Sequence, residues 1–295
     1  MTGDLLIHGM HGLGDALHQR AIIRELLRRH DRLYLESSWV SVYHDFNTDR
    51  LRIIRKPMPL RTQSKNVERE AGGFWRGEVP SDLPELRIGY APATVRSTGS
   101  VLAAMCRACM VDYRRADFRL PLPDEWPRWL NSHKPIMLYR PLTVRKEWAS
   151  TAARNPDPAA YYDLVMSVRD RYHVISVADI APDEEWIISE DIGADEEYHD
   201  GELSFEHLAG LAKSADLVFC APGFATVLAQ AVGTKCVTVF GGYESSTSFA
   251  GGARYSPWLG IDTMNPCQCW KPDHACDKRI DVPPARDAIV RFLTA

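Results

Sequence analysis

The chain begins with a short apolar run and a glycine-rich turn, Leu5-Leu6-Ile7-His8 followed by Gly9-Met10-His11-Gly12-Leu13-Gly14-Asp15. The apolar run predicts a buried strand. A helix is expected from about Ala16 to Arg29, with apolar residues on one side and an arginine every fourth residue on the other. Leu33 to Leu35 then predicts a second strand. This order is typical of βαβ units and a parallel sheet.

The same alternation restarts after a proline-rich stretch between Pro121 and Pro135, which we interpret as a linker. Four further strands are expected at Pro135–Tyr139, His173–Val177, Leu217–Cys220 and Cys236–Phe240. Helices are expected after Asp157, which suits a helix N-cap, around Leu208 and Leu211, from Phe224 to Ala231, and from Ala285 to Leu293. The pattern predicts an α/β protein with two domains, residues 1–130 and 131–295.

Composition excludes several classes of protein. The chain has 295 residues, of which 45% are apolar and 25% charged, with a net charge of −4, as expected for a soluble globular protein. No apolar run approaches the roughly 20 residues of a membrane span, and the first residues lack a signal peptide, so a cytoplasmic location is expected. Seven cysteines, an odd number, favour reduced thiols over a disulfide scaffold.

Charge is distributed unevenly. The chain up to Lys134 carries 21 Lys and Arg against 16 Asp and Glu, whereas the remainder carries 14 against 23. The most basic segment contains Arg50, Arg52, Arg55, Lys56, Arg61, Lys65, Arg69 and Arg76, opposed by Glu68 and Glu70. This segment is either a solvated, partly mobile surface loop or a patch that faces an anion. In the second interpretation Arg55 and Lys56 bind an anionic acceptor.

Two functions are open for the turn after the first strand. In a dinucleotide site, Gly12 and Gly14 would begin a Gly-x-Gly-x-x-Gly motif and Glu36 would hold a ribose, which would make the protein an NAD(P)-dependent oxidoreductase. Leu17 occupies the third glycine position, however, and Asp15 would place a carboxylate beside the pyrophosphate.

In the other function, Asp15 is a general base that removes a proton from an acceptor hydroxyl. His18, one helical turn later, would contact the acceptor or tune the acid. A purely structural role for Asp15 is to cap the helix that follows.

A second turn, Ala221-Pro222-Gly223-Phe224-Ala225-Thr226, lies between a predicted strand and a predicted helix. Backbone N–H groups at such a helix start suit a diphosphate. Arg140, Arg145 and Lys146 follow the first strand of this half and would neutralise phosphate oxygens at the same sheet edge. We predict that a donor substrate with such a diphosphate is bound by Gly14, Arg140, Arg145, Lys146, Gly223 and Thr226.

Metal signals are weak. Cys267, Cys269, His274 and Cys276 offer four ligands but are compressed relative to zinc-finger spacings, and Cys106 and Cys109 lie in a helical stretch. The chain also lacks Asp-x-Asp, Gly-x-Ser-x-Gly and Walker motifs. We predict no metal and no cofactor, and whether the cluster of Cys267, Cys269, His274 and Cys276 binds a metal is left open.

The sequence resembles glycosyltransferase family 9, the ADP-heptose:lipopolysaccharide heptosyltransferases. Gly12 to His18 resembles the family's N-terminal signature, and 208–218 and 228–241 resemble its donor-side segment. Arg145-Lys146-Glu147-Trp148 is similar to the family's Lys-Arg-Trp element, and the tail from Cys267 to Ile280 is also similar.

The resemblance implies a GT-B fold, in which two Rossmann-like domains with parallel sheets face each other across a cleft and the final helix crosses back to the first domain. It implies an inverting, metal-independent transfer from a nucleotide-sugar, the co-substrate, with Asp15 as general base. Lys146, with Arg145, would balance the charge of the departing diphosphate.

At the donor turn the chain departs from the family. Ala221, Pro222 and Gly223 stand where the family has Asp, a small residue and Gly, and the family's following His is also missing. Donor and acceptor are therefore open. The acceptor is expected to be anionic, either a phosphorylated glycan of a lipopolysaccharide core or a hydroxylated modified nucleic acid, and peripheral contact with a membrane is a further expectation. A non-catalytic sugar-nucleotide-binding protein is the third alternative.

Overall fold

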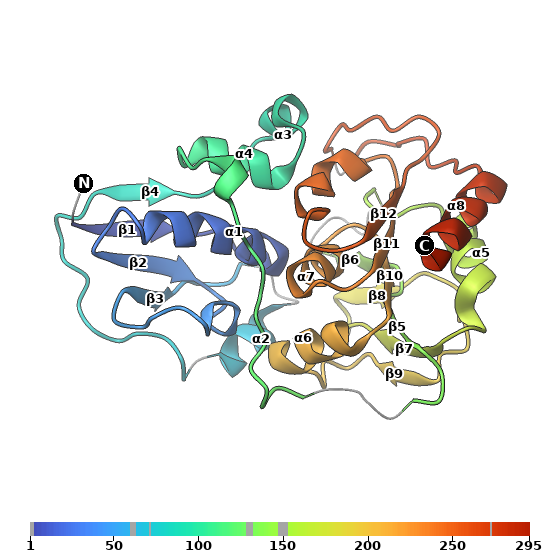
Figure 1. The fold of residues 1–295 in the computed structure, drawn as a ribbon, viewed down its shortest axis with the longest axis horizontal. Coiled ribbons are helices and arrows are strands. Elements are labelled where there is room, and N and C mark those ends of the chain that lie inside the picture. The colour runs from blue at the N-terminus through green and yellow to red at the C-terminus, as the bar shows by residue number, and fades with distance from the viewer. Residues whose placement is uncertain (1–2, 60–62, 71, 128–131, 147–152, 272) are drawn as a thin grey trace. The chain divides into compact units, whose positions relative to one another are not determined.

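The computed structural model describes residues 3–59, 63–70, 72–127, 132–146, 153–271 and 273–295. The chain forms two compact units, Met1–Pro121 and Leu122–Ala295 (Figure 1). Each has a parallel sheet and its own helices, and each is described by itself.

The first unit contains a four-stranded parallel sheet in the order β3-β2-β1-β4. Its strands are β1 (Asp4–His8), β2 (Arg32–Ser37), β3 (Leu51–Arg55) and β4 (Glu85–Arg87). The predicted strands at β1 and β2 are confirmed. The next strand, β3, lies inside the basic segment, so that segment is not the single surface loop that we considered.

Helices of the first unit are α1 (Leu13–Leu26), α2 (Ser64–Arg69), α3 (Pro92–Thr98) and α4 (Val101–Ala108). The first, α1, starts three residues earlier than expected because Gly12 is its N-cap. Arg20 lies on the predicted arginine side of this helix, and its side chain is nevertheless fully buried. Arg20 pairs with Asp45 through two bonds of 2.8 Å and donates to the carbonyls of Phe118 and Arg119, which explains how a charge is accommodated there.

The second unit has a six-stranded parallel sheet in the order β12-β11-β10-β5-β7-β9. Its strands are β5 (Ile136–Tyr139), β7 (His173–Val177), β9 (Glu196–Tyr198), β10 (Leu217–Cys220), β11 (Cys236–Val239) and β12 (Trp258–Ile261). All four strands predicted for this half are present. A separate antiparallel pair joins β6 (Thr143–Arg145) to β8 (Glu185–Ile187).

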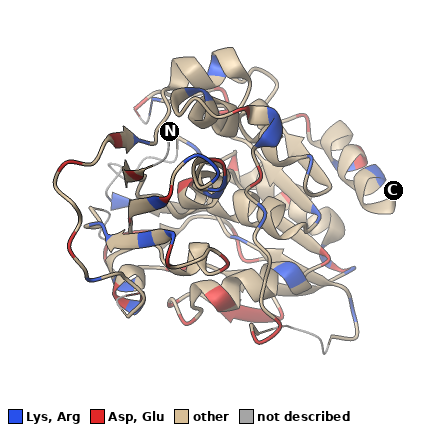
Figure 2. Cartoon of the chain, turned by 60° about the vertical axis from the view of Figure 1, so that its left-hand side comes forward, with Lys and Arg blue, Asp and Glu red and all other residues tan. Residues whose placement is uncertain are grey.

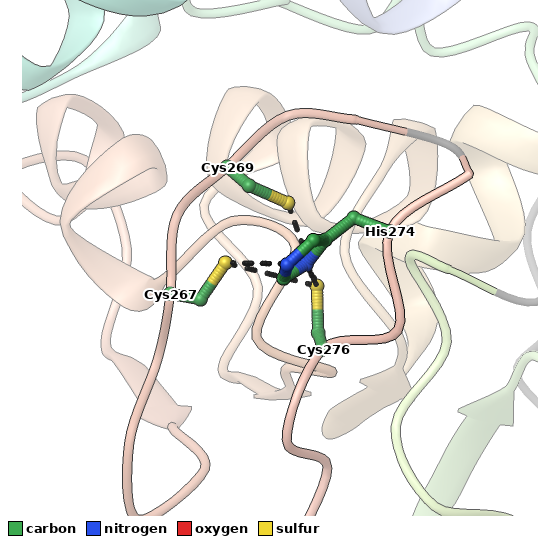
Figure 3. A group of neighbouring side chains, drawn as sticks. All are labelled: Cys267, Cys269, His274 and Cys276. Carbon is green, nitrogen blue, oxygen red and sulfur yellow. Dashed lines mark hydrogen bonds between the residues drawn. The ribbon is translucent and has the colours of Figure 1, made fainter.

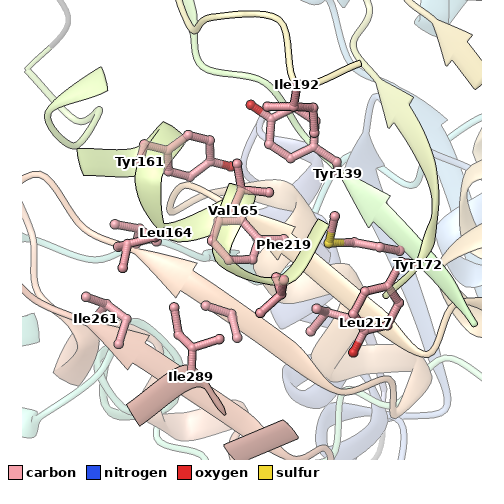
Figure 4. Packing of buried hydrophobic residues seen from close by; sticks show 14 of the residues in the cluster. Tyr139, Tyr161, Leu164, Val165, Tyr172, Ile192, Leu217, Phe219, Ile261 and Ile289 are labelled. Atoms are coloured by element: carbon pink, nitrogen blue, oxygen red, sulfur yellow. The ribbon is translucent and has the colours of Figure 1, made fainter. Parts of the chain in front are cut away.

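Four helices cover this sheet: α5 (Pro158–Arg169), α6 (Phe205–Ser214), α7 (Phe224–Val232) and α8 (Val282–Thr294). As predicted, Asp157 caps α5, accepting a hydrogen bond of 2.9 Å from the Ala160 amide. Figure 4 shows the core between α5, α8 and the sheet, where Tyr161 packs against Phe219 and where Ile289 of α8 is fully buried. The final helix is thus part of the second unit's core, and its crossing to the first domain stays a prediction.

None of the helices in the described ranges has the length and apolarity needed to cross a lipid bilayer.

Candidate functional site

The turn after β1 is braced by three side chains. Gln19 accepts a 2.7 Å bond from the Met10 amide, Trp39 Nε1 donates to the His11 carbonyl at 2.8 Å, and Lys56 Nζ donates to the Gly9 carbonyl. A Cβ at Gly9 would lie 2.6 Å from the Glu36 carbonyl, which explains the glycine. The turn therefore holds the start of α1 in one position.

Asp15 lies in the first turn of α1 and is partly exposed. It is not the helix cap, since Gly12 takes that position without a side-chain bond. Its Oδ1 accepts a 3.3 Å hydrogen bond from the Tyr90 hydroxyl, and a Cβ at Gly12 would come within 2.6 Å of Oδ2. The carboxylate thus has a fixed place beside the positive end of α1, as a general base requires. Tyr90 lies in a stretch that carries no motif in the sequence.

His18 is buried against Phe118, with ring centroids 4.9 Å apart in an edge-to-face contact. Its Nδ1 has no hydrogen-bond partner among the described residues. Burial lowers the pKa of His18 to about 4, so the ring is neutral at pH 7. The proposed acceptor contact would require an exposed ring, whereas the structure places it in the core of the first unit.

This burial predicts a pH-dependent stability. Between its ordinary pKa of 6.5 and about 4, the unfolded chain binds a proton at His18 that the folded chain does not. The contribution of neutral His18 to the free energy of unfolding is therefore fully present above about pH 6.5. It decreases as the pH falls, by about 2 kcal/mol between pH 7 and pH 5. Urea unfolding of the wild type and of His18→Gln at the two pH values measures the difference. An equal loss in both proteins would contradict this role of His18.

Glu36, the candidate ribose ligand of the dinucleotide interpretation, already has a partner. Its Oε2 lies 2.7 Å from His8 Nδ1, while His8 Nε2 lies 3.0 Å from Glu85 Oε2. The hydrogen bond to Glu36, followed by that to Glu85, raises the pKa of His8. This pairing disfavours a free ribose-binding carboxylate at the end of β2.

The basic segment is largely engaged within the first unit. Arg50 donates to the carbonyls of His30 and Asp31 at 2.7 and 3.1 Å, Arg52 lies 4.7 Å from the centroid of the Trp75 ring, and Arg55 pairs with Glu68. Arg61 lies outside the described residues. In Figure 2 the blue Lys and Arg segments lie on helices and strands as well as loops. Acceptor binding by Arg55 and Lys56 stays a prediction, and each would use a side chain that already holds an internal contact.

In the second unit, the predicted donor turn is present between β10 and α7. Gly223 is the N-cap of α7, with φ +150° and no side-chain cap, so the first amides of the helix are not capped by a side chain. Thr226 is fully buried and lies 3.1 Å from Thr238 Oγ1 and 3.4 Å from Cys220 Sγ. The Thr226 side chain therefore supports the turn from within, and its contact with the donor stays a prediction.

The three basic residues that are predicted to bind the donor differ in position. Arg140 follows β5 and donates to the Val177 carbonyl at 3.3 Å, and burial lowers its pKa. Arg145 ends β6 and lies 3.0 Å from Glu185, and Lys146 lies 3.7 Å from Glu184. Of these three residues, Arg140 alone directly follows a strand of the six-stranded sheet. Glu147 and Trp148, which complete the family-like element, lie outside the described residues, and Gly14 lies in α1 of the first unit.

Cys267, Cys269, His274 and Cys276 converge after β12 (Figure 3). One ligand atom from each lies within 4.8 Å of all the others. By contrast, Cys106 and Cys109 are buried at the end of α4. Three thiols and one imidazole suit a tetrahedral, thiophilic ion such as Zn²⁺ or iron. The residues thus fit a metal that the sequence did not predict, because ligand spacing along the chain does not report how tightly a loop folds back.

No family model matches the chain, and no curated protein matches it. Solved structures do. The chain is similar to the iron-containing dodecameric glycosyltransferase TibC of enterotoxigenic E. coli, with a TM-score of 0.68, 16% identity, and coverage of 99% of this chain and 76% of that one. It is also similar to a family 9 glycosyl transferase of Veillonella parvula, at TM-score 0.57 and 10% identity, covering 99% and 97%.

A third similar structure is the E. coli heptosyltransferase WaaC with ADP, at TM-score 0.54 and 12% identity, covering 99% of each chain. At such identities the likeness concerns the fold. The chain thus has the α/β fold of these glycosyltransferases, with a parallel sheet in each of two units, as the sequence resemblance implied.

Proposed function

We propose that the protein is a glycosyltransferase that moves a sugar from a nucleotide-sugar to a hydroxyl of an anionic acceptor. The observation that carries the proposal is Asp15, a partly exposed carboxylate fixed in the first turn of α1 in a chain with the heptosyltransferase fold. The first unit would bind the acceptor and the second the donor.

In the proposed reaction, Asp15 takes the proton of the acceptor hydroxyl while the hydroxyl oxygen attacks the anomeric carbon. The bond from that carbon to the diphosphate breaks, and the anomeric configuration inverts. The amides at the start of α7 and the Arg140 guanidinium would stabilise the charge on the diphosphate. Arg145 and Lys146 would join them by exchanging Glu185 and Glu184 for phosphate oxygens.

The transfer step is proposed to need no metal or other cofactor. Ions that assist diphosphate departure prefer oxygen ligands and keep open positions. The cysteine cluster instead offers four nitrogen and sulfur ligands, which fill a tetrahedral ion. An ion bound there would supply a cross-link between chain segments.

The donor is proposed to carry a nucleoside diphosphate, with ADP as the first candidate, because two of the similar structures are described with ADP and with an ADP-heptose. The acceptor is proposed to be a phosphorylated glycan, as in a lipopolysaccharide core, met in the cytoplasm or at the membrane surface. A hydroxylated modified nucleic acid is the alternative. DNA binding measured at several salt concentrations separates the two acceptors, because phosphate contacts release counterions. No binding to DNA at low salt would exclude the nucleic acid.

A ligand screen tests the proposal. ADP-, GDP-, UDP- and CMP-sugars, with NAD(H) and NADP(H) as the competing class, are added while thermal unfolding is followed. A ligand at 100 times its Kd stabilises the folded chain by about 2.7 kcal/mol. We expect one nucleotide-sugar class to raise the melting temperature. If only a nicotinamide dinucleotide does so, the protein is an oxidoreductase and not a transferase. If a sugar-nucleotide binds but is not turned over, the protein is a non-catalytic sugar-nucleotide-binding protein.

A further inference from the structure

We propose that Cys267, Cys269, His274 and Cys276 bind one tetrahedral metal ion, Zn²⁺ or iron, and that this ion fixes residues 241–244 at the end of β11. The inference that this segment supports donor binding rests on the proposed function. The metal site and the fixed position of the segment do not.

Distances within the cluster match tetrahedral coordination. Bonds of about 2.3 Å to sulfur and about 2.0 Å to nitrogen imply tetrahedral edges of about 3.8 Å between two sulfurs and about 3.5 Å between sulfur and nitrogen. The sulfur of Cys276 lies 4.0 Å from that of Cys267 and 3.5 Å from that of Cys269. His274 Nδ1 lies 3.6 Å from the Cys267 sulfur and 3.5 Å from the Cys276 sulfur.

A disulfide does not explain these distances. Bonded sulfurs are about 2.05 Å apart, much closer than the two sulfur pairs that include Cys276, and all three cysteines are free. A disulfide would also leave the third thiol and the imidazole without a role. A hydrogen-bonded cluster of neutral thiols would gain little, because S–H is a weak donor.

The backbone around the cysteines is bent to turn their side chains inward. Gln268 and Trp270 have φ angles of +51° and +58°, in the left-handed region that non-glycine residues rarely adopt. The Lys271 amide points at the Cys269 sulfur at 3.4 Å, as expected where that sulfur is a thiolate. A bound ion would compensate for the cost of this conformation.

The same loop is hydrogen-bonded to the chain that leaves β11. The Gln268 amide donates to the Gly242 carbonyl at 2.9 Å, and the Trp270 amide donates to the Tyr243 carbonyl at 3.2 Å. The rings of Tyr243 and Trp270 lie 5.7 Å apart. Gly242 has φ +86°, and a Cβ there would lie 2.9 Å from the Asp277 carbonyl, so only glycine allows this approach.

The opposite side of residues 241–244 is held by the segment before α5. Glu244 is buried and accepts from Arg154 Nε at 2.7 Å. Lys278, two residues beyond Cys276, donates to the Asn155 carbonyl at 2.7 Å. The ion would therefore join residues 241–244 and 154–155, both at the end of the sheet where the donor turn also lies, since β10 and β11 are parallel.

The first experiment measures metal in the purified full-length protein by elemental analysis. We expect about one zinc or iron ion per chain, and reconstitution with Co²⁺ should give the sulfur-to-cobalt absorption of a tetrahedral site. Cys269→Ser should lose the ion, His274→Cys should keep it, and Cys106→Ala, which changes a buried thiol outside the cluster, should match the wild type. If Cys269→Ser fails to fold, metal-depleted and reloaded wild type replaces it. Wild type without bound metal would overturn the site.

The second experiment compares hydrogen exchange in the metal-loaded and metal-depleted protein. Peptides that cover 241–244 and 267–271 should exchange at least about tenfold faster without metal, while those of β5 and β7 stay protected. Unchanged exchange at 241–244 would overturn the fixing role even if the metal binds. Titration with ADP, GDP, UDP and CMP then tests the donor link. Binding that weakens only after depletion supports the link, and equal binding in both forms refutes it. If none of the four nucleotides binds either form, the proposed function alone is refuted.

Discussion

Replacing Asp15 with Asn is expected to lower kcat for sugar transfer by about 10²- to 10⁴-fold, the usual contribution of a general base. The amide is nearly isosteric and can still accept the hydrogen bond of Tyr90, but it cannot take a proton. Donor binding should persist, because the nucleotide is assigned to the second unit. Single-turnover transfer and nucleotide titration measure the two quantities separately.

Tyr90→Phe provides the matched control. It removes the hydroxyl that donates to Asp15 at 3.3 Å and leaves the carboxylate in place. We expect a loss of less than about tenfold in kcat, because the carboxylate that takes the proton is still present. Transfer by Asp15→Asn at a near-normal rate would show that Asp15 is not the base.

Replacing Arg20 with Met is expected to destabilise the first unit by about 3–5 kcal/mol, as for one partner removed from a buried ion pair. Arg20 is buried, and its guanidinium meets both Asp45 oxygens and the carbonyls of Val42, Phe118 and Arg119. Met fills a similar volume but donates no hydrogen bond to these acceptors, of which Arg24 still reaches one Asp45 oxygen and the Arg119 carbonyl. Because two units need not unfold together, the measurement is the exchange free energy of α1 amides.

Arg24→Met is the control for charge. Arg24 also contacts Asp45, at 3.0 Å, but its side chain is 25% exposed. Its loss should cost no more than about 1 kcal/mol, in line with accessible ion pairs. Equal effects at the two arginines would mean that net charge, rather than the buried hydrogen bonds of Arg20, determines the stability.

Much of the fold was predictable where elements carry an apolar run or an apolar stripe. The runs at β1 and β10 and the apolar stripe of α7 each identified an element correctly. Strand β4 has only three residues, two of them charged, so its place in the sheet depends on pairing with β1 and not on local pattern.

Candidate site residues were harder to place because sequence position does not reveal burial. On α1 nearly every position from Ala16 to Leu26 is buried, so His18 and Arg20 point into the core although they are polar. The cysteine cluster shows a different difficulty. Its four candidate ligands were judged by their spacing along the chain, whereas the left-handed backbone at Gln268 and Trp270 brings them together.

The strand order also sets when each sheet is completed during synthesis. In the first unit, β1 pairs with β4, which is synthesised about 80 residues later. In the second unit, β5 pairs with β10 after a similar interval. Such non-local pairings form slowly and expose strand edges until they close. The last strand of the first sheet ends at Arg87, so all strands of that sheet are synthesised before any strand of the second sheet. We therefore expect the nascent chain to fold its units in succession, and we expect misassembly to begin at the edges of β1 and β5.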